Sequence, residues 1–145
     1  MQQIDRRNKS ILLTNILIVV GLSIVMIGCD YFFKPPSFEQ VMKEPTKLLN
    51  KKSMTMIDQE TRFDSGVILP NKVFQYNCTF INYDKASLNI VGLKKDAEHV
   101  LLKRVKTDPY LKILRDNKAT VIYNYKDKNG EVLFELPFTP NEYLR

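Results

Sequence analysis

The sequence predicts an α+β domain behind an N-terminal membrane anchor, with two helices packed against an antiparallel sheet of about four strands. Three observations lead to this fold class. Residues 10–29 carry no charge. Residues 73–83 and 119–138 alternate apolar and polar side chains, the period of two that a half-buried strand requires. Residues 88–106 change to a helical period. The predicted order of elements in the domain is α–ββ–α(α)–ββ.

The uncharged run "SILLTNILIVVGLSIVMIGC" comes first and predicts a membrane segment. It spans 20 residues, about what a helix needs to cross ~30 Å of hydrocarbon. Arg6, Arg7 and Lys9 precede it, and such bases favour a cytoplasmic N-terminus. We therefore expect residues 1–33 to be an anchor, with the rest of the chain on the other side of the membrane.

The end of this run resembles the bacterial lipobox. Met26-Ile27-Gly28-Cys29 matches its last three positions, with Met26 in place of the preferred Leu. The resemblance implies that the Cys29 thiol receives a diacylglycerol and becomes the new N-terminus. In Gram-negative lipoproteins an Asp directly after this cysteine is associated with retention in the inner membrane, so Asp30 implies that location.

Two other fates of the segment stay open. The run is long for a signal, and Tyr31, Phe32 and Phe33 could form an aromatic belt at the interface of a true transmembrane helix. Release by ordinary signal peptidase is disfavoured, because no Ala of the usual A-x-A pattern occurs before Ala86. A span and a lipidated Cys29 both leave the domain facing the periplasm from the inner membrane.

A short spacer and the first half of the domain follow. Lys34-Pro35-Pro36 predicts a stiff spacer, residues 34–36, because paired prolines favour extended geometry. The domain is expected at 37–145. Ser37 suits a helix N-cap, the helix should end near 50–52, and Pro45 should kink or split it. Residues 53–70 are expected to be extended, to turn at Pro70-Asn71, and to pair with 73–83 as an antiparallel hairpin.

The second half predicts a helix followed by a hairpin. Over residues 88–106 the apolar side is formed by Leu93, Ala97, Val100 and Leu101, and the polar side by Lys95, His99, Lys103 and Lys106. Asp108-Pro109 should end this helix and begin a short one, with Leu111 and Leu114 inward.

Residues 119–138 contain the clearest hairpin pattern in the chain. Asn129-Gly130 favours a type I′ turn, in which both central residues take positive φ. One buried face should hold Val121, Tyr123 and Tyr125, and the other strand should bury Val132, Phe134, Leu136 and Phe138. Pro137 suggests that the last strand is an edge strand.

Four segments in this order, "MIDQETRFDSG", "FQYNCTF", "VKTDP" and "YNYKDKNG", resemble small uncharacterised bacterial membrane-anchored proteins. The likeness spans about residues 45–140. It implies membrane anchorage and carries over no activity.

Few residues offer catalytic or metal chemistry. His99 is the single histidine, and its place among lysines favours a solvated side chain over a general base. The sequence has no glycine-rich phosphate loop and no H-E-x-x-H or C-x-x-C pair. Cys78 is expected to be a buried thiol that packs as a small hydrophobe. We therefore expect no metal, no cofactor and no small-molecule substrate.

One acidic cluster is the exception. Asp58, Glu60 and Asp64 lie close in sequence, and paired carboxylates can do acid–base work or bind Ca²⁺. The simpler interpretation is an exposed strand face with Arg62 as a local partner. An enzyme that uses these three residues is kept as an alternative.

Positive charge is concentrated on the helical region. Residues 94–118 hold eight bases and four acids, a net charge of +4 out of +6 for the whole chain. The predicted compartment excludes nucleic acid, so anionic headgroups or an acidic envelope protein are the partners that such a surface would meet. The contact candidates are Lys95, Lys103 and Lys106.

The sequence thus predicts a non-enzymatic, membrane-anchored periplasmic module that binds an envelope component. An accessory subunit and an immunity or exclusion factor both fit this description, and a purely structural lipoprotein is a separate alternative.

Overall fold

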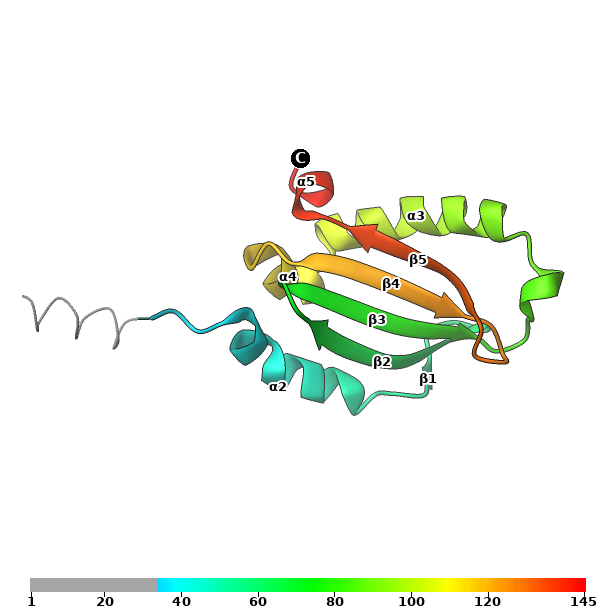
Figure 1. Cartoon of the computed structure of the whole chain (residues 1–145), viewed down its shortest axis with the longest axis horizontal. Coiled ribbons are helices and arrows are strands. Elements are labelled where there is room, and N and C mark those ends of the chain that lie inside the picture. The colour runs from blue at the N-terminus through cyan, green and yellow to red at the C-terminus, as the bar shows by residue number, and fades with distance from the viewer. Residues whose placement is uncertain (1–33) are drawn as a thin grey trace, which may run out of the picture. The chain divides into compact units, whose positions relative to one another are not determined.

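A five-stranded sheet organises the part of the chain that the computed structural model describes, residues 34–145. The strands follow one another in space in their sequence order. Helix α2 (Phe38–Asn50) lies along β2 and helix α3 (Ile90–Thr107) along β5, so the two long helices lie toward opposite edges of the sheet (Figure 1). The domain is α+β, as the sequence predicted.

The remaining elements are short. The strands are β1 (Thr55–Met56), β2 (Thr61–Leu69), β3 (Val73–Phe80), β4 (Thr120–Lys126) and β5 (Val132–Phe138). Between and after them come the 3₁₀ segments η1 (Lys85–Ser87) and η2 (Pro109–Leu111) and the helices α4 (Lys112–Asp116) and α5 (Pro140–Tyr143).

The sheet is mixed, and the expectation of a purely antiparallel sheet was wrong. The pairs β2–β3 and β4–β5 are antiparallel hairpins, as predicted, but β3 and β4 run parallel. A parallel pair needs a long crossover, usually through a helix. Helix α3 provides it by carrying the chain back along the sheet, so that β4 enters in the same direction as β3.

Helix α2 begins at a capping box. The Gln40 amide donates to Ser37 Oγ at 3.3 Å, and the Ser37 amide donates to Gln40 Oε1 at 2.8 Å, which satisfies two amides at the start of the helix. Ser37 is therefore the N-cap, as predicted. Pro45 lies inside the helix but does not split it.

Helix α3 and the segment after it confirm the predicted order. The Asn89 side chain caps α3, and Asp108 ends it before the short η2–α4 segment. Leu111 and Leu114 are buried as expected. Val100 is different, because 64% of its surface is exposed although the helical period placed it on the apolar side.

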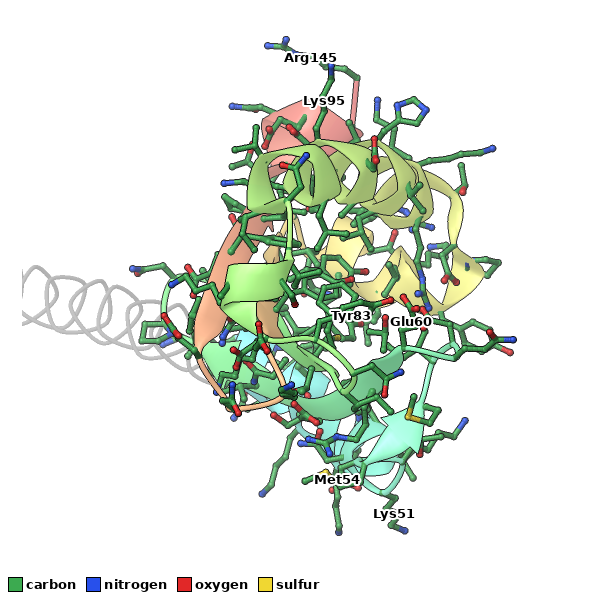
Figure 2. All side chains as sticks on the ribbon, turned by 90° about the vertical axis from the view of Figure 1, so that its right-hand side faces the viewer. Lys51, Met54, Glu60, Tyr83, Lys95 and Arg145 are labelled. Carbon is green, nitrogen blue, oxygen red and sulfur yellow. The ribbon has the colours of Figure 1, made fainter. Side chains whose placement is uncertain are left out.

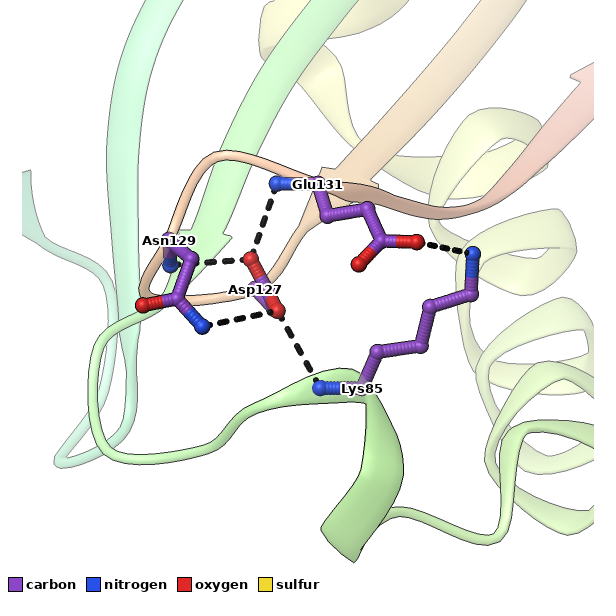
Figure 3. Close-up of polar contacts among 4 residues, drawn as sticks. All are labelled: Lys85, Asp127, Asn129 and Glu131. Carbon is purple, nitrogen blue, oxygen red and sulfur yellow. Dashed lines mark hydrogen bonds and ion pairs between the residues drawn. The ribbon is translucent and has the colours of Figure 1, made fainter.

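The hairpin between β4 and β5 closes differently from the expected type I′ turn. Of the two central residues of this turn, only Gly130 has positive φ, at 84°, so the prediction for Asn129 was wrong. The Asp127 carboxylate instead accepts hydrogen bonds from the amides of Asn129 and Glu131, both at 2.8 Å, and from the Lys85 amide at 3.1 Å (Figure 3). These bonds tie the hairpin to η1.

Burial of this carboxylate opposes its ionisation, but the hydrogen bonds from Glu131, Lys85 and Asn129 outweigh burial and lower the pKa of Asp127. A bulge at Tyr125/Lys126 accompanies the loop and leaves Val132 44% exposed, so Val132 does not join the predicted buried face.

The core lies between the sheet and the helices. Val121, Tyr123, Phe134 and Leu136 are buried in it as predicted, whereas Tyr76 is only half-buried. Every buried apolar residue of the described chain falls between Phe38 and Tyr143, inside the compact unit 37–145. This unit therefore contains a complete core and is expected to fold on its own.

Residues 1–33 lie outside the described part of the chain, and with them Cys29, the predicted anchor and the lipobox-like sequence. Among residues 34–145, no helix combines the length and apolar character that a membrane span needs. Residues 34–36, the predicted spacer, are exposed and have no regular secondary structure.

Candidate functional site

A cavity of about 840 Å³ lies on the helical side of the sheet, between α2 and α3. Its floor is the helical face of the sheet, and α2 and α3 border it. Its walls include Leu48 and Leu49 of α2 and Ala97 and Val100 of α3. Its volume is in the range of sites that hold small ligands in proteins, roughly 300–1,000 Å³.

Aromatic rings form the floor of the cavity. Tyr76 of β3 stacks on Tyr123 of β4, with ring centroids 5.0 Å apart and planes 14° from parallel. Phe80 stacks in the same way on Tyr125, at 5.2 Å and 18°. The parallel pairing of β3 with β4 places Tyr76 opposite Tyr123, whereas Phe80 lies two residues beyond Cys78, the partner of Tyr125. The floor is thus a continuous apolar and polarisable surface.

The tyrosines of this floor also present hydroxyl groups. Burial raises the pKa of Tyr76, of Tyr125 and of Tyr123, the last to about 12, so all three phenols stay protonated at neutral pH. Among residues 34–145, the only tyrosine hydroxyls that donate a hydrogen bond are those of Tyr83 and Tyr143. The three hydroxyls at the cavity therefore have no protein partner within that range and are available to a ligand.

One guanidinium borders the cavity close to these phenols. Burial raises the pKa of Tyr123, and the positive charge of Arg104 partly opposes that rise. Arg104 Nε donates to Asp108 Oδ2 at 3.1 Å. Within the described residues its Nη1 and Nη2 groups donate no hydrogen bond, so they too can bind a ligand.

Cys78 lies between the aromatic pairs on β3 and is buried and unpaired. Burial raises the pKa of its thiol to about 12. A thiol that stays protonated is a poor nucleophile. Cys78 therefore acts as a small apolar group, as the sequence predicted.

The structure does not bring the three predicted acidic residues into one site. Asp58 accepts hydrogen bonds from the amides of Glu60 and Thr61 at 2.8 and 2.7 Å and borders the cavity. Burial of the Asp58 carboxylate opposes its ionisation, but these bonds prevail and lower its pKa. Glu60 instead accepts a hydrogen bond from the Tyr83 hydroxyl at 2.5 Å, where the two side chains meet in Figure 2.

The third acid, Asp64, is separate from this pair. It binds Arg62 at 2.7 Å and the Thr79 hydroxyl at 2.6 Å, and these residues do not line the cavity. The expectation of Arg62 as a local partner is confirmed for Asp64. Within residues 34–145 no three metal-ligating side chains gather at one point.

The predicted basic residues lie on the outside of α3. Lys95, Lys103 and Lys106 are exposed, as is His99, and none of them lines the cavity. Figure 2 shows Lys95 projecting from α3 away from the sheet. The basic surface and the cavity are therefore separate features of the same helix.

Sequence reasoning missed the cavity. It assigned Leu93, Ala97, Val100 and Leu101 to the apolar side of the helix. The helical period of apolar residues is identical whether that side contacts packed side chains or borders a cavity, so the period does not distinguish the two. The width of this apolar side could have indicated the cavity, because Val100 extends it beyond the surface that the sheet can cover.

Comparisons with known proteins add a family and a fold. A family model described as "Domain of unknown function (DUF8479)" matches residues 37–134. No curated protein matches the chain. A crystal structure of a "putative secreted protein" from Pseudomonas aeruginosa is similar with a TM-score of 0.62 and 8% sequence identity, over 72% of this chain and 91% of that chain. At this identity the likeness shows a shared fold.

Proposed function

This chain belongs to the family described as domain of unknown function DUF8479, and we propose that it is a non-enzymatic, extracytoplasmic binding module of the bacterial envelope that holds an apolar ligand between α2 and α3. The observation that carries the proposal is the apolar cavity of about 840 Å³ over the aromatic floor. Exposed apolar side chains at its border, Leu48, Met56, Ile57 and Val100, give such a ligand an entrance.

The sequence and the comparisons support the compartment. The uncharged run at residues 10–29, with bases before it, favours anchorage in the inner membrane with the domain in the periplasm. The similar crystal structure bears the name of a secreted protein. We keep both forms of anchor in the proposal, a transmembrane helix or a lipid on Cys29. An accessory subunit and an immunity or exclusion factor are both compatible with it.

Filling the cavity should abolish ligand binding without unfolding the domain. Ala97 lines the cavity, and Ala97→Trp places an indole in it. The affinity of residues 37–145 for an environment-sensitive apolar dye such as N-phenylnaphthylamine should fall by about tenfold or more, because the contacts that bind an apolar ligand are replaced. The fragment is used because detergent, needed for the anchored chain, would itself fill an apolar cavity.

The control is Glu98→Trp, the same substitution at the next residue, which is exposed and does not line the cavity. It should bind the dye as the wild type does. Thermal melts of both variants establish that they are folded. Equal dye binding by wild type and Ala97→Trp would contradict a functional cavity.

We propose a second contact for the basic side of α3. Three exposed lysines on a tethered domain can meet anionic headgroups or an acidic envelope protein, each contributing about 1 kcal/mol near an anionic surface. Reversing Lys95, Lys103 and Lys106 to Glu should leave the melting temperature nearly unchanged and weaken sedimentation with phosphatidylglycerol vesicles. Added salt should weaken the wild-type association as well, because the Debye length is about 8 Å at physiological ionic strength.

The matched control reverses three exposed lysines at α2, namely Lys43, Lys47 and Lys51. This control should weaken vesicle binding less than the α3 reversal does, because the proposed contact is specific to α3. Vesicle binding that is insensitive both to the α3 reversal and to salt would reduce these lysines to a solvated surface.

A further inference from the structure

Exposed apolar side chains gather around the cavity. Five of the ten large apolar residues that are exposed within residues 34–145 line it, and we call these five the rim. The rim comprises Leu48 of α2, Met56 of β1, Ile57, Val100 of α3 and Tyr110 of η2. Tyr110 is 91% exposed and Val100 is 64% exposed. Apolar side chains that gather at one exposed place mark an interaction site.

The rim distinguishes three kinds of occupant. A small molecule inside the cavity leaves side chains as exposed as Tyr110 and Val100 in water. A bilayer is flat on the scale of a domain, so it covers the rim without filling the cavity. A protein segment with a row of apolar side chains does both, because its backbone lies over the rim while its side chains enter the cavity.

A second copy of the domain does not offer such a row within residues 34–145. Outside the cavity, each exposed large apolar residue of the described chain lies on a different segment. These residues are Met54, Val67, Val91, Val132 and Leu144. Two copies that met rim to rim would leave both cavities unfilled. These observations favour a segment of a different polypeptide.

The lining of the cavity favours a helical segment. Strands β3 and β4 lie inside the sheet, so their amides and carbonyls are paired with neighbouring strands. Helices α2 and α3 bond their own backbones. An extended peptide in the cavity would therefore leave its backbone groups without partners, which is unfavourable in apolar surroundings. An α-helix satisfies these groups within itself.

Opposite walls of the cavity carry opposite charges. Arg104 pairs with Asp108 at 3.1 Å, and Asp58 accepts the amides of its own loop. Lys52, just after α2, and Asp96 of α3 both line the cavity, are exposed and form no ion pair within residues 34–145. A helix with acids along one flank and bases along the other complements both, whereas an anionic bilayer would be repelled by Asp96.

We propose that the cavity and its rim receive the apolar face of an amphipathic α-helix from another envelope protein, with acidic side chains of that helix toward Lys52 and basic ones toward Asp96. The inference rests on the proposed function, because it names the partner class of the same cavity. The apolar face of such a helix recurs at intervals of three and four residues, which gives the partner a recognisable pattern.

The test uses the full chain in its native membranes. The photoreactive residue p-benzoylphenylalanine replaces Met56 or Val100, which lie on different walls of the cavity, and crosslinked peptides are sequenced by mass spectrometry after irradiation. Both positions are expected to capture one segment of one partner, at residues three, four or seven apart. The control places the same residue at Val91, an exposed valine of α3 that does not line the cavity. It should not capture that segment.

Further variants test the cavity and the charges. Ala97→Trp should remove the crosslinks from both rim positions, and Glu98→Trp should keep them. Lys52→Glu and Asp96→Lys should each lower the crosslinking yield by about threefold or more, because each brings like charges together. The controls are Lys51→Glu and Glu98→Lys, at exposed neighbouring residues that do not line the cavity. They should leave the yield unchanged.

Crosslinks to lipid, to a second copy or to residues 10–29 would overturn the partner, as would equal capture from Val91. Captured residues at every second position would indicate an extended segment and overturn the helix. A yield that neither charge reversal changes would overturn the orientation. Dye binding that is lost in Ala97→Trp, with no crosslink at either rim position, keeps the proposed binding module and loses only the helical partner.

Discussion

Phe134→Asp should abolish cooperative folding of residues 37–145. Phe134 is 6% exposed and packs on the Tyr125 ring, with centroids 5.1 Å apart. A carboxylate there enters the apolar core without a partner and should cost about 4 kcal/mol or more. Single domains are stable by only about 5–15 kcal/mol. Circular dichroism during urea titration should show a lost or strongly lowered midpoint.

The control is Val132→Asp on the same strand. The sequence assigned Val132 to the same buried face, but it is 44% exposed because of the bulge in the hairpin. This substitution should be tolerated. Stability of the Phe134→Asp variant equal to that of the wild type would mean that the strand presents its other face to the core.

Phe38→Ala should have the second largest effect. Phe38 is the first residue of α2 and is 3% exposed, so it anchors the start of that helix in the core. Removing a buried phenyl ring typically costs 3–5 kcal/mol, from lost burial and the space left behind. The free energy of unfolding from urea titration measures the loss.

Phe38→Leu should restore most of that stability, because it refills much of the space. Glu39→Ala, at the exposed next residue, should behave nearly as the wild type. If Phe38→Ala cost nothing, α2 would be an independent extension and the folded domain would begin after it.

Local patterns predicted the local structure well. The hairpins around Asn71 and Asn129, the cap at Ser37 and the break at Asp108 all depend on residues close in sequence. The pairing of β3 with β4 does not, because a strand alternates with the same period whether its neighbour runs parallel or antiparallel. The direction of pairing is decided by how α3 crosses the sheet.

Long-range contacts also explain the turn that was predicted wrongly. Asn129-Gly130 alone favours type I′, but Asp127 gathers the amides of its own loop and of Lys85, 42 residues away. The sequence did not predict the cavity for a related reason. Whether Ala97 and Val100 meet packed side chains or open space depends on where α2 sits, which no pattern within α3 reports.

The order of the strands has a consequence for how copies of the domain associate. Edge strands expose unpaired amides and carbonyls that can join the sheets of neighbouring molecules. Here one edge is formed by the two residues of β1, paired with Arg62 and Phe63, and by the rest of β2, where the Asn50 side chain bonds the amide and carbonyl of Gly66. The other is β5, where Pro137 has no amide hydrogen and α3 packs alongside. Copies of the domain therefore offer each other little free sheet edge through which to polymerise.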